Sequence, residues 1–258
     1  MLGKLMKYEF MAMGRVLLPM FGALLAVTLI NRLLMLLPAQ APIVISTVVA
    51  SFLIAAVFII TLILILQRFM KNLLSEEGYL MMTLPVRTDS LILSKLFVAT
   101  IFVFAAVLVA VLGIFILTSQ DFVYMFSQLG VALSFVDFQG VVLFIQALML
   151  SVFGVFASIL LLYTCMSLSL LVNKRRGLFA FGAFVVITTV LQVLGTIALV
   201  TVSVSSGVPN FFEGITRGMS GFGISQLVFA GAFIFALAQN ALFYFITRYM
   251  LKRRLNLQ

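Results

Sequence analysis

The chain has 258 residues, of which 64% are hydrophobic and only 9% are charged, and its mean hydropathy is +1.31. A soluble domain is about half apolar and a quarter charged, so this composition predicts an integral membrane protein. The sequence contains no His, no Trp and one Cys, which excludes an imidazole base, a His-ligated metal and an intrachain disulfide.

The net charge of +9 is explained by where the basic residues lie along the chain. With a cytoplasmic N-terminus and six crossings, only Arg32 and Arg217 of the 16 Lys and Arg residues fall on the outer side. The inner side receives the rest, namely Lys4, Lys7, Arg15, Arg68, Lys71, Arg87, Lys95, Lys174, Arg175, Arg176, Arg248, Lys252, Arg253 and Arg254. This asymmetry obeys the positive-inside rule, so it predicts cytoplasmic N- and C-termini. The basic residues then face anionic lipid headgroups, and we expect no nucleic-acid binding.

Residues 1–15 have the periodicity of an amphipathic helix, with apolar side chains on one face and Lys4, Lys7 and Arg15 on the other. We expect this helix to lie along the inner leaflet, at the membrane interface. Glu9 falls within the apolar face at 100° per residue and therefore needs a partner or a water-filled neighbour. A structural ion pair is the favoured role, with a substrate contact as the alternative.

Six apolar runs follow, and each is long enough to cross a bilayer. They predict an all-α, polytopic membrane protein with a single transmembrane domain over residues 1–258. The expected membrane helices are 16–37, 43–66, 91–117, 141–172, 178–202 and 224–246. An aromatic-rich segment before the fourth helix and a short dipping segment between the fifth and sixth are expected at the outer interface.

The segment 67–85, QRFMKNLLSEEGYLMMTLP, is the one long stretch with charges of both signs, and it lies between the second and third crossings. Such a polar segment must lie outside the hydrocarbon. Residues 71–80 favour a short helix, Gly78 suits its C-terminal end, and Pro85 prevents a helix from resuming at once. We expect a soluble partner to bind this segment and move the membrane part.

Catalytic and energy-coupling motifs are missing from the sequence. It contains no GxSxG, HExxH, paired intramembrane aspartates or GxxxxGK[ST], so ordinary hydrolysis and nucleotide binding by this chain are not expected. Amides remain at depth, and interhelical hydrogen bonding or substrate contact are the open roles for them. Snorkelling to phosphates is the first interpretation of Arg32, with a gate or substrate contact as the second. The candidate translocation path therefore comprises Arg32, Gln146, Gln192, Gln239 and Asn240.

Three motifs resemble the ABC transporter type-2 permease family, and more narrowly its small six-helix members from Gram-positive bacteria. They are LMKYEF at 5–10, LLSEEGYLMMTLP at 73–85, and Ser94 with Lys95 at the start of the third crossing. The order of elements matches along the whole chain, although only EGYL…TLP is moderately specific. The resemblance implies a permease subunit in the bacterial plasma membrane. Two permease copies, identical or close paralogues, would pair with two cytoplasmic ATPase subunits that bind ATP and Mg.

In this family the coupling helix lies between the second and third crossings, so the resemblance implies that 71–79 occupies a groove of the ATPase. Glu76 and Glu77 would face basic residues of the partner, and Leu73 and Tyr79 would supply apolar anchors. The implied contact set is Lys71, Leu73, Leu74, Glu76, Glu77, Gly78, Tyr79 and Pro85, with Lys174, Arg175 and Arg176 as a possible second cytoplasmic contact. The alternative is that the loop is only solvated.

A path rich in Phe and Met favours an amphipathic or hydrophobic substrate, with a peptide toxin or antimicrobial peptide preferred over lipid or polysaccharide. Two other classes of protein remain open. A motor-independent channel or secondary carrier would give flux in liposomes without an ATPase. A structural membrane anchor would give no flux and would tolerate changes at Gln192 or Asn240.

Overall fold

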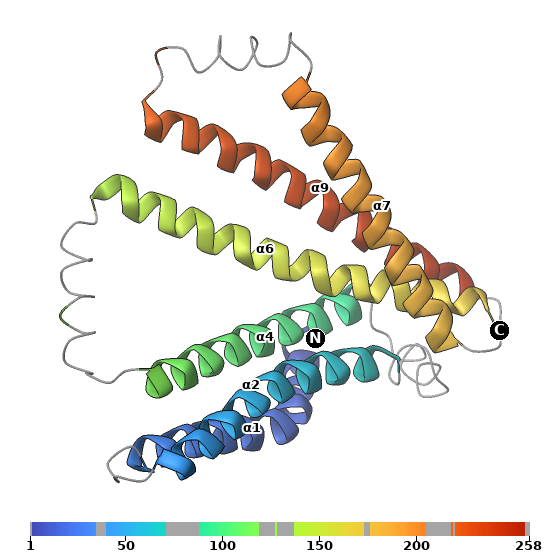
Figure 1. Ribbon diagram of the computed structural model, residues 1–258. Helices are drawn as coiled ribbons and strands as arrows, with labels where there is room; N and C mark the ends of the chain where they lie inside the picture. Colours follow the sequence, from blue (N-terminus) through green and yellow to red (C-terminus); the bar gives the residue numbers. More distant parts are fainter. Residues whose placement is uncertain are drawn as a thin grey trace. The chain divides into compact units, whose positions relative to one another are not determined.

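The computed structural model describes residues 2–34, 40–70, 88–118, 127, 137–172, 176–204, 218 and 220–255 (Figure 1). Six long helices account for nearly all of these residues, and no strand occurs among them. The helices are α1 (Leu2–Leu34), α2 (Gln40–Phe69), α4 (Thr88–Thr118), α6 (Phe138–Leu168), α7 (Arg176–Val204) and α9 (Gly221–Leu255). A short 3-10 turn, η2 (Ser169–Leu171), follows α6.

Each of the six helices contains a segment long and apolar enough to cross a membrane. Many large apolar side chains lie on their outer faces, including Phe52 and Phe144, which are 73% and 69% exposed. Water would penalise this exposure, whereas lipid tails solvate such side chains without cost. The chain is therefore an all-α, multi-pass membrane protein, as the sequence predicted.

The helices form two compact units, residues 1–137 and 138–258. In unit 1, α1 and α4 run parallel: Glu9 pairs with Lys95 near their N-terminal ends, and Gly113 of α4 meets Leu24 and Thr28 farther along α1. Helix α2 runs antiparallel to α1, since Asn31 Nδ2 donates a 2.9 Å hydrogen bond to Thr47 Oγ1 at one end. The start of α1, the end of α2 and the start of α4 consequently meet at one end of the unit.

Unit 2 is built around a second parallel pair, α6 and α9. Gln146 pairs with Gln226 near the start of both helices, and Thr164 with Thr247 near their ends. Tyr163 and Phe243 are the largest fully buried side chains of this interface, and Cys165 is buried beside them. Helix α7 joins α6 through η2 and contacts it along fewer residues. The sequence predicts that all six helices form one bundle. Because this prediction concerns how the two units pack together, it stays a prediction.

The N-terminal segment differs from the expected interfacial helix. Residues 2–34 form one continuous helix that passes through Pro19, so 1–15 is not a separate element. On its apolar face Met13 and Leu17 are buried inside unit 1, at 3% and 0% exposed, whereas Leu5 and Met6 are half-buried and Phe10 is 43% exposed; Lys4, Lys7 and Arg15 are exposed. The part of the apolar pattern at Met13 and Leu17 therefore reflects packing within unit 1, and contact of residues 1–15 with the inner leaflet stays a prediction.

The other helix boundaries in the structure differ from the predicted boundaries by smaller amounts. Helix α9 continues to Leu255, about two turns beyond the predicted end at 246, so Arg248 and Lys252 lie within it. The coupling segment begins inside α2, because residues 67–69 complete that helix, and 71–87 lie outside the described residues. Most of the two predicted outer segments lies outside them as well.

Gly113 is a position where α4 lies close to α1. A Cβ at this position would lie 2.9 Å from Leu24 Cδ2 and 3.4 Å from Thr28 Cγ2, and both residues are fully buried. A Cβ at this position would have to displace the end of the Leu24 side chain, and a larger side chain would also press on Thr28.

We predict that Gly113→Leu destabilises unit 1 by about 1–3 kcal/mol, the usual cost of overpacking. The measurement is the temperature at which the purified protein loses its monodisperse size-exclusion peak. Gly22→Leu on α1 is the matched control, since nothing lies within 4 Å of its Cβ position. Equal melting temperatures for the two variants would contradict the close contact.

Candidate functional site

Three charged side chains converge at the end of unit 1 where α1 starts, α2 ends and α4 starts. Glu9 lies in the third turn of α1, Arg68 is the penultimate residue of α2, and Lys95 lies in the third turn of α4. Arg68 Nη1 donates to Glu9 Oε2 at 2.6 Å, and Lys95 Nζ donates to Glu9 Oε1. Each carboxylate oxygen thus accepts from one cation, and we name Glu9, Arg68 and Lys95 the charge cluster.

The charge cluster is largely withdrawn from solvent. The side chains of Glu9 and Lys95 are 10% and 4% exposed, whereas that of Arg68 is 27% exposed. Phe69, Ile92 and Leu96 around it are buried. Taking a lysine out of water costs several kcal/mol unless a carboxylate compensates it, so Lys95 depends on Glu9 for its place in the structure. One carboxylate therefore holds three helices together.

Two members of the cluster belong to the helices that precede and follow the coupling segment in the sequence. Arg68 is the third residue before Lys71, and Lys95 lies ten residues after Pro85. Because Glu9 binds both cations, α1 is connected to the two helices that bracket this segment. The predicted contact residues Lys71, Leu73, Leu74, Glu76, Glu77, Gly78, Tyr79 and Pro85 themselves lie outside the described residues.

The sequence analysis assigned Glu9 a structural ion pair, and the structure gives it two cationic partners. It did not identify those partners, because Arg68 and Lys95 lie 59 and 86 residues away along the chain. Both had been counted as inner-side charges, Arg68 also as part of the coupling segment and Lys95 as part of the Ser94–Lys95 motif, but neither as a partner of Glu9. The single signal available was the carboxylate on an apolar helix face.

A series of neutral polar contacts joins α6 to α9 in unit 2. Gln146 and Gln226 exchange hydrogen bonds, at 2.5 and 3.2 Å. Asn240 Nδ2 donates to the carbonyl oxygens of Phe153 at 3.0 Å and Ala236 at 2.8 Å. Farther along, the hydroxyls of Thr164 and Thr247 lie 3.0 Å apart. Of the candidate path residues, Gln146 and Asn240 thus serve interhelical hydrogen bonding.

The remaining path candidates are distributed differently. Gln192 is exposed on α7, Gln239 is half-buried on α9, and Arg32 is half-buried on α1 in unit 1. The predicted translocation path did not include Gln226, although this residue forms the amide pair with Gln146. Its signal was a second glutamine near the start of a helix that runs parallel to α6. Lys174 and Arg175 lie outside the described residues, and Arg176 begins α7.

A groove with a volume of about 300 Å³ lies beside the amide pair, between α6 and α9. Two amide side chains and five apolar residues line it: Gln146, Met149, Gln226, Phe229, Ala230, Phe233 and Ile234. The Phe153 ring packs edge-on against Phe233 with centroids 4.9 Å apart at its deeper end. Such a lining suits a ligand with an apolar body and a few hydrogen-bonding groups.

The fold and these sites define a multi-pass helical membrane protein with a buried charge cluster in one unit and a neutral polar interface in the other. No family model, curated protein or solved structure matches the chain. Function must therefore be argued from the chain's own residues.

We predict that Glu9→Gln destabilises the protein by about 3–5 kcal/mol, because it leaves the buried Lys95 without its counter-charge. Thermal unfolding of the purified protein measures the effect. Lys7→Gln, an exposed position on the same helix, is the matched control and should unfold like the unchanged protein.

The double variant Glu9→Gln with Lys95→Met separates charge from packing. It should recover at least half of the lost stability, since both members of the buried pair are then neutral. If the stability lost by the double variant equals the sum of the losses of Glu9→Gln and Lys95→Met measured singly, Glu9 and Lys95 do not depend on one another.

Proposed function

We propose that this chain is the membrane subunit of an ATP-driven exporter of the ABC transporter type-2 permease kind. The observation that carries the proposal is the charge cluster, which joins α1 to the end of α2 and to the start of α4, the two helices that precede and follow the coupling segment. The absence of a nucleotide-binding motif from the sequence and the EGYL…TLP block support it. ATP and Mg are bound by the partner ATPase in this proposal.

The coupling step would use the cluster as a mechanical connection. A partner that displaces 71–85 pulls on the end of α2 and the start of α4, and both cations are held on one carboxylate. Buried ion pairs tolerate little separation, because each charge loses its compensation when it moves away. The three helices of unit 1 would therefore move together rather than slide past one another, in the manner of a rigid-body transition.

The ATPase contact remains as the resemblance implies. Leu73 and Tyr79 would be the apolar anchors and Glu76 and Glu77 the acidic group, with Lys174–Arg176 as a second contact. Two ATPase subunits and two permease copies would assemble in a bacterial plasma membrane, with the chain's termini in the cytoplasm. The packing of unit 1 supports one part of this arrangement, since the start of α1, the end of α2 and the start of α4 meet at one end.

An amphipathic peptide is the substrate class that the described surfaces favour. The groove between α6 and α9 offers Met149, Phe229 and Phe233 to apolar side chains. The amides of Gln146 and Gln226 can exchange their mutual hydrogen bonds for bonds to a peptide backbone, which presents the same donor and acceptor groups. A polysaccharide would need more polar lining than this groove has.

A proton-coupled carrier is the second candidate, and the buried Glu9 is the observation that favours it. A carboxylate inside a membrane protein can act as a proton relay. Glu9 lies near the N-terminal end of α1 and has a cation on each carboxylate oxygen, and both features favour the structural role instead. Peptide flux into proteoliposomes that follows a proton gradient with no ATPase present would establish the carrier and end the exporter proposal.

We predict that Glu76→Lys with Glu77→Lys abolishes ATP-driven peptide uptake into inside-out vesicles that contain the chain and its ATPase. The reversed charges would repel the basic groove of the partner and release the ATPase from the purified complex. Folding should be unchanged, because both residues belong to a segment outside the membrane. Thermal unfolding of the permease alone checks this.

Asn256→Lys with Gln258→Lys is the control, since it adds positive charge near the C-terminus on the same expected side. It should leave uptake and co-purification intact. Full transport by the Glu76→Lys, Glu77→Lys variant would refute coupling through this segment.

A further inference from the structure

The contact between α6 and α9 is packed unevenly along its length. The buried residues of α6 all lie in its second half, between Ala157 and Ser167. On α9 the buried residues begin at Ala236 and extend to Leu251. In the first 15 residues of each helix no side chain is buried. The pair is therefore tightly packed where both helices end, which we name the packed end, and open where both begin, which we name the loose end.

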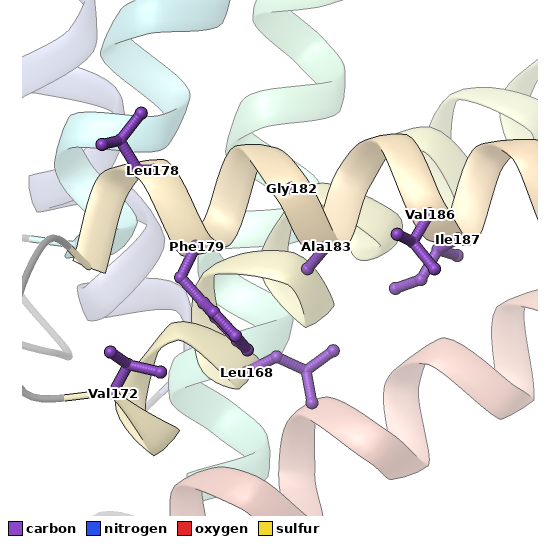
Figure 2. Close-up of a pocket in the computed structure, with 8 residues that line it drawn as sticks. All are labelled: Leu168, Val172, Leu178, Phe179, Gly182, Ala183, Val186 and Ile187. Carbon is purple, nitrogen blue, oxygen red and sulfur yellow. The ribbon is translucent and has the colours of Figure 1, made fainter.

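Helix α7 adjoins the packed end. Leu168 and Val172 line an apolar groove of about 660 Å³ together with residues from the first part of α7 (Figure 2). Those residues of α7 are Leu178, Phe179, Gly182, Ala183, Val186 and Ile187. The end of α6 therefore has α7 as a neighbour in addition to α9, so three helices meet at the packed end.

Side-chain contacts at the loose end follow a single seam. Gln146 and Gln226 exchange hydrogen bonds, and seven residues later the Phe153 ring packs edge-on against Phe233. Seven residues is the spacing of contacts between parallel helices that wind around each other. The amide-lined groove of about 300 Å³ lies beside this seam. Hydrogen bonds between neutral side chains of membrane helices contribute little stability, so the two helices can separate here at small cost.

The next position on the seam is unfavourable while the helices are in contact. Asn240 lies seven residues after Phe233, and its Nδ2 donates to the carbonyl oxygens of Phe153 and Ala236. Its Oδ1 is buried and accepts no hydrogen bond. A buried acceptor without a donor costs free energy, and this cost is removed when a donor reaches it. Separation at the loose end is therefore opposed only by weak contacts and relieves the carboxamide oxygen of Asn240.

We propose that α6 and α9 form a clamp that opens at the loose end when a peptide enters the amide-lined groove, with Gln146 and Gln226 as its latch. The packed end keeps the two helices together and acts as the hinge. This inference rests on the peptide substrate of the proposed function and adds how that substrate reaches its site. A lipid tail is a poorer occupant, because it offers no hydrogen bond to either amide.

The latch makes the peptide prefer the open clamp. In the closed clamp each glutamine bonds the other. In the open clamp both amides can bond a peptide backbone, which presents N–H donors and C=O acceptors. A ligand shifts an equilibrium only by its different affinity for the two states, and here only the open clamp offers these bonds. Insertion of one backbone should widen the loose end by about 5 Å, the spacing between hydrogen-bonded backbones.

Distances between spin labels measure this widening in the full chain, reconstituted into nanodiscs without an ATPase. Val141→Cys with Val228→Cys places labels on exposed positions of α6 and α9 at the loose end, and Ser158→Cys with Leu242→Cys does so at the packed end. The native Cys165 is buried and should stay unlabelled, which mass spectrometry checks. The probe is a synthetic peptide of alternating Leu and Ser residues. It should lengthen the loose-end distance by about 5 Å and leave the packed-end distance unchanged.

Two changes test the latch itself. The same peptide with N-methylated backbone amides cannot donate hydrogen bonds from its backbone and should not widen the loose end. Gln146→Ala with Gln226→Ala should widen it without any peptide and weaken peptide affinity by about five-fold for each hydrogen bond lost. Ser151→Ala with Ser225→Ala is the matched control, because both hydroxyls bond only the backbone of their own helix, and it should change neither quantity. Thermal unfolding checks that both double variants fold.

Each other outcome overturns the clamp. A loose-end distance that the peptide leaves unchanged means that the groove does not open. Equal widening by the N-methylated peptide means that the amides are not the latch, and equal widening at both label pairs means that the helices separate without a hinge. The proposed function is tested separately, because the distances are measured without an ATPase. Widening without ATP-driven uptake would refute the exporter alone, and ATP-driven uptake without widening would refute the clamp alone.

Discussion

The carboxylate of Glu9 is the constraint on which the arrangement of unit 1 depends. Charges within a membrane protein are expensive, and they persist where they are paired. Here one acidic group pairs with two cations from two other helices, so the position of each helix is fixed by the same two oxygens. At the opposite end of the α1–α2 pair the fully buried Asn31 bonds Thr47. Helices α1 and α2 are thus fastened at both ends, and α4 is pressed against α1 at Gly113 between them.

Unit 2 depends on weaker interactions. Interhelical hydrogen bonds between neutral side chains in membranes contribute about 0.6 kcal/mol on average, because the separated helices find other partners. Gln146, Gln226 and the two threonines can therefore exchange partners at small cost, whereas the charge cluster cannot. A transporter needs both properties, a part that transmits displacement and a part that rearranges around cargo. In the proposed function unit 1 supplies the first and unit 2 the second.

The sequence predicted the helical class and the six membrane segments because hydropathy is a local property that tertiary packing does not alter. It failed where the local signal had two physical causes. The face of α1 that carries Met13 and Leu17 would suit lipid headgroups or a neighbouring helix equally, and the structure gives the second. Glu9 signalled that it needed a partner, but the pairing with Lys95 spans 86 residues and follows from the parallel packing of α1 on α4. Hydropathy says nothing about such packing.

The groove beside α7 follows from the same distinction between local pattern and packing. The positions of Lys174, Arg175 and Arg176 are explained by topology alone, and a sequence pattern gives them no further role. The structure adds that Gly182 and Ala183 leave space beside Leu168, which depends on how α7 packs against the end of α6 and not on any local pattern.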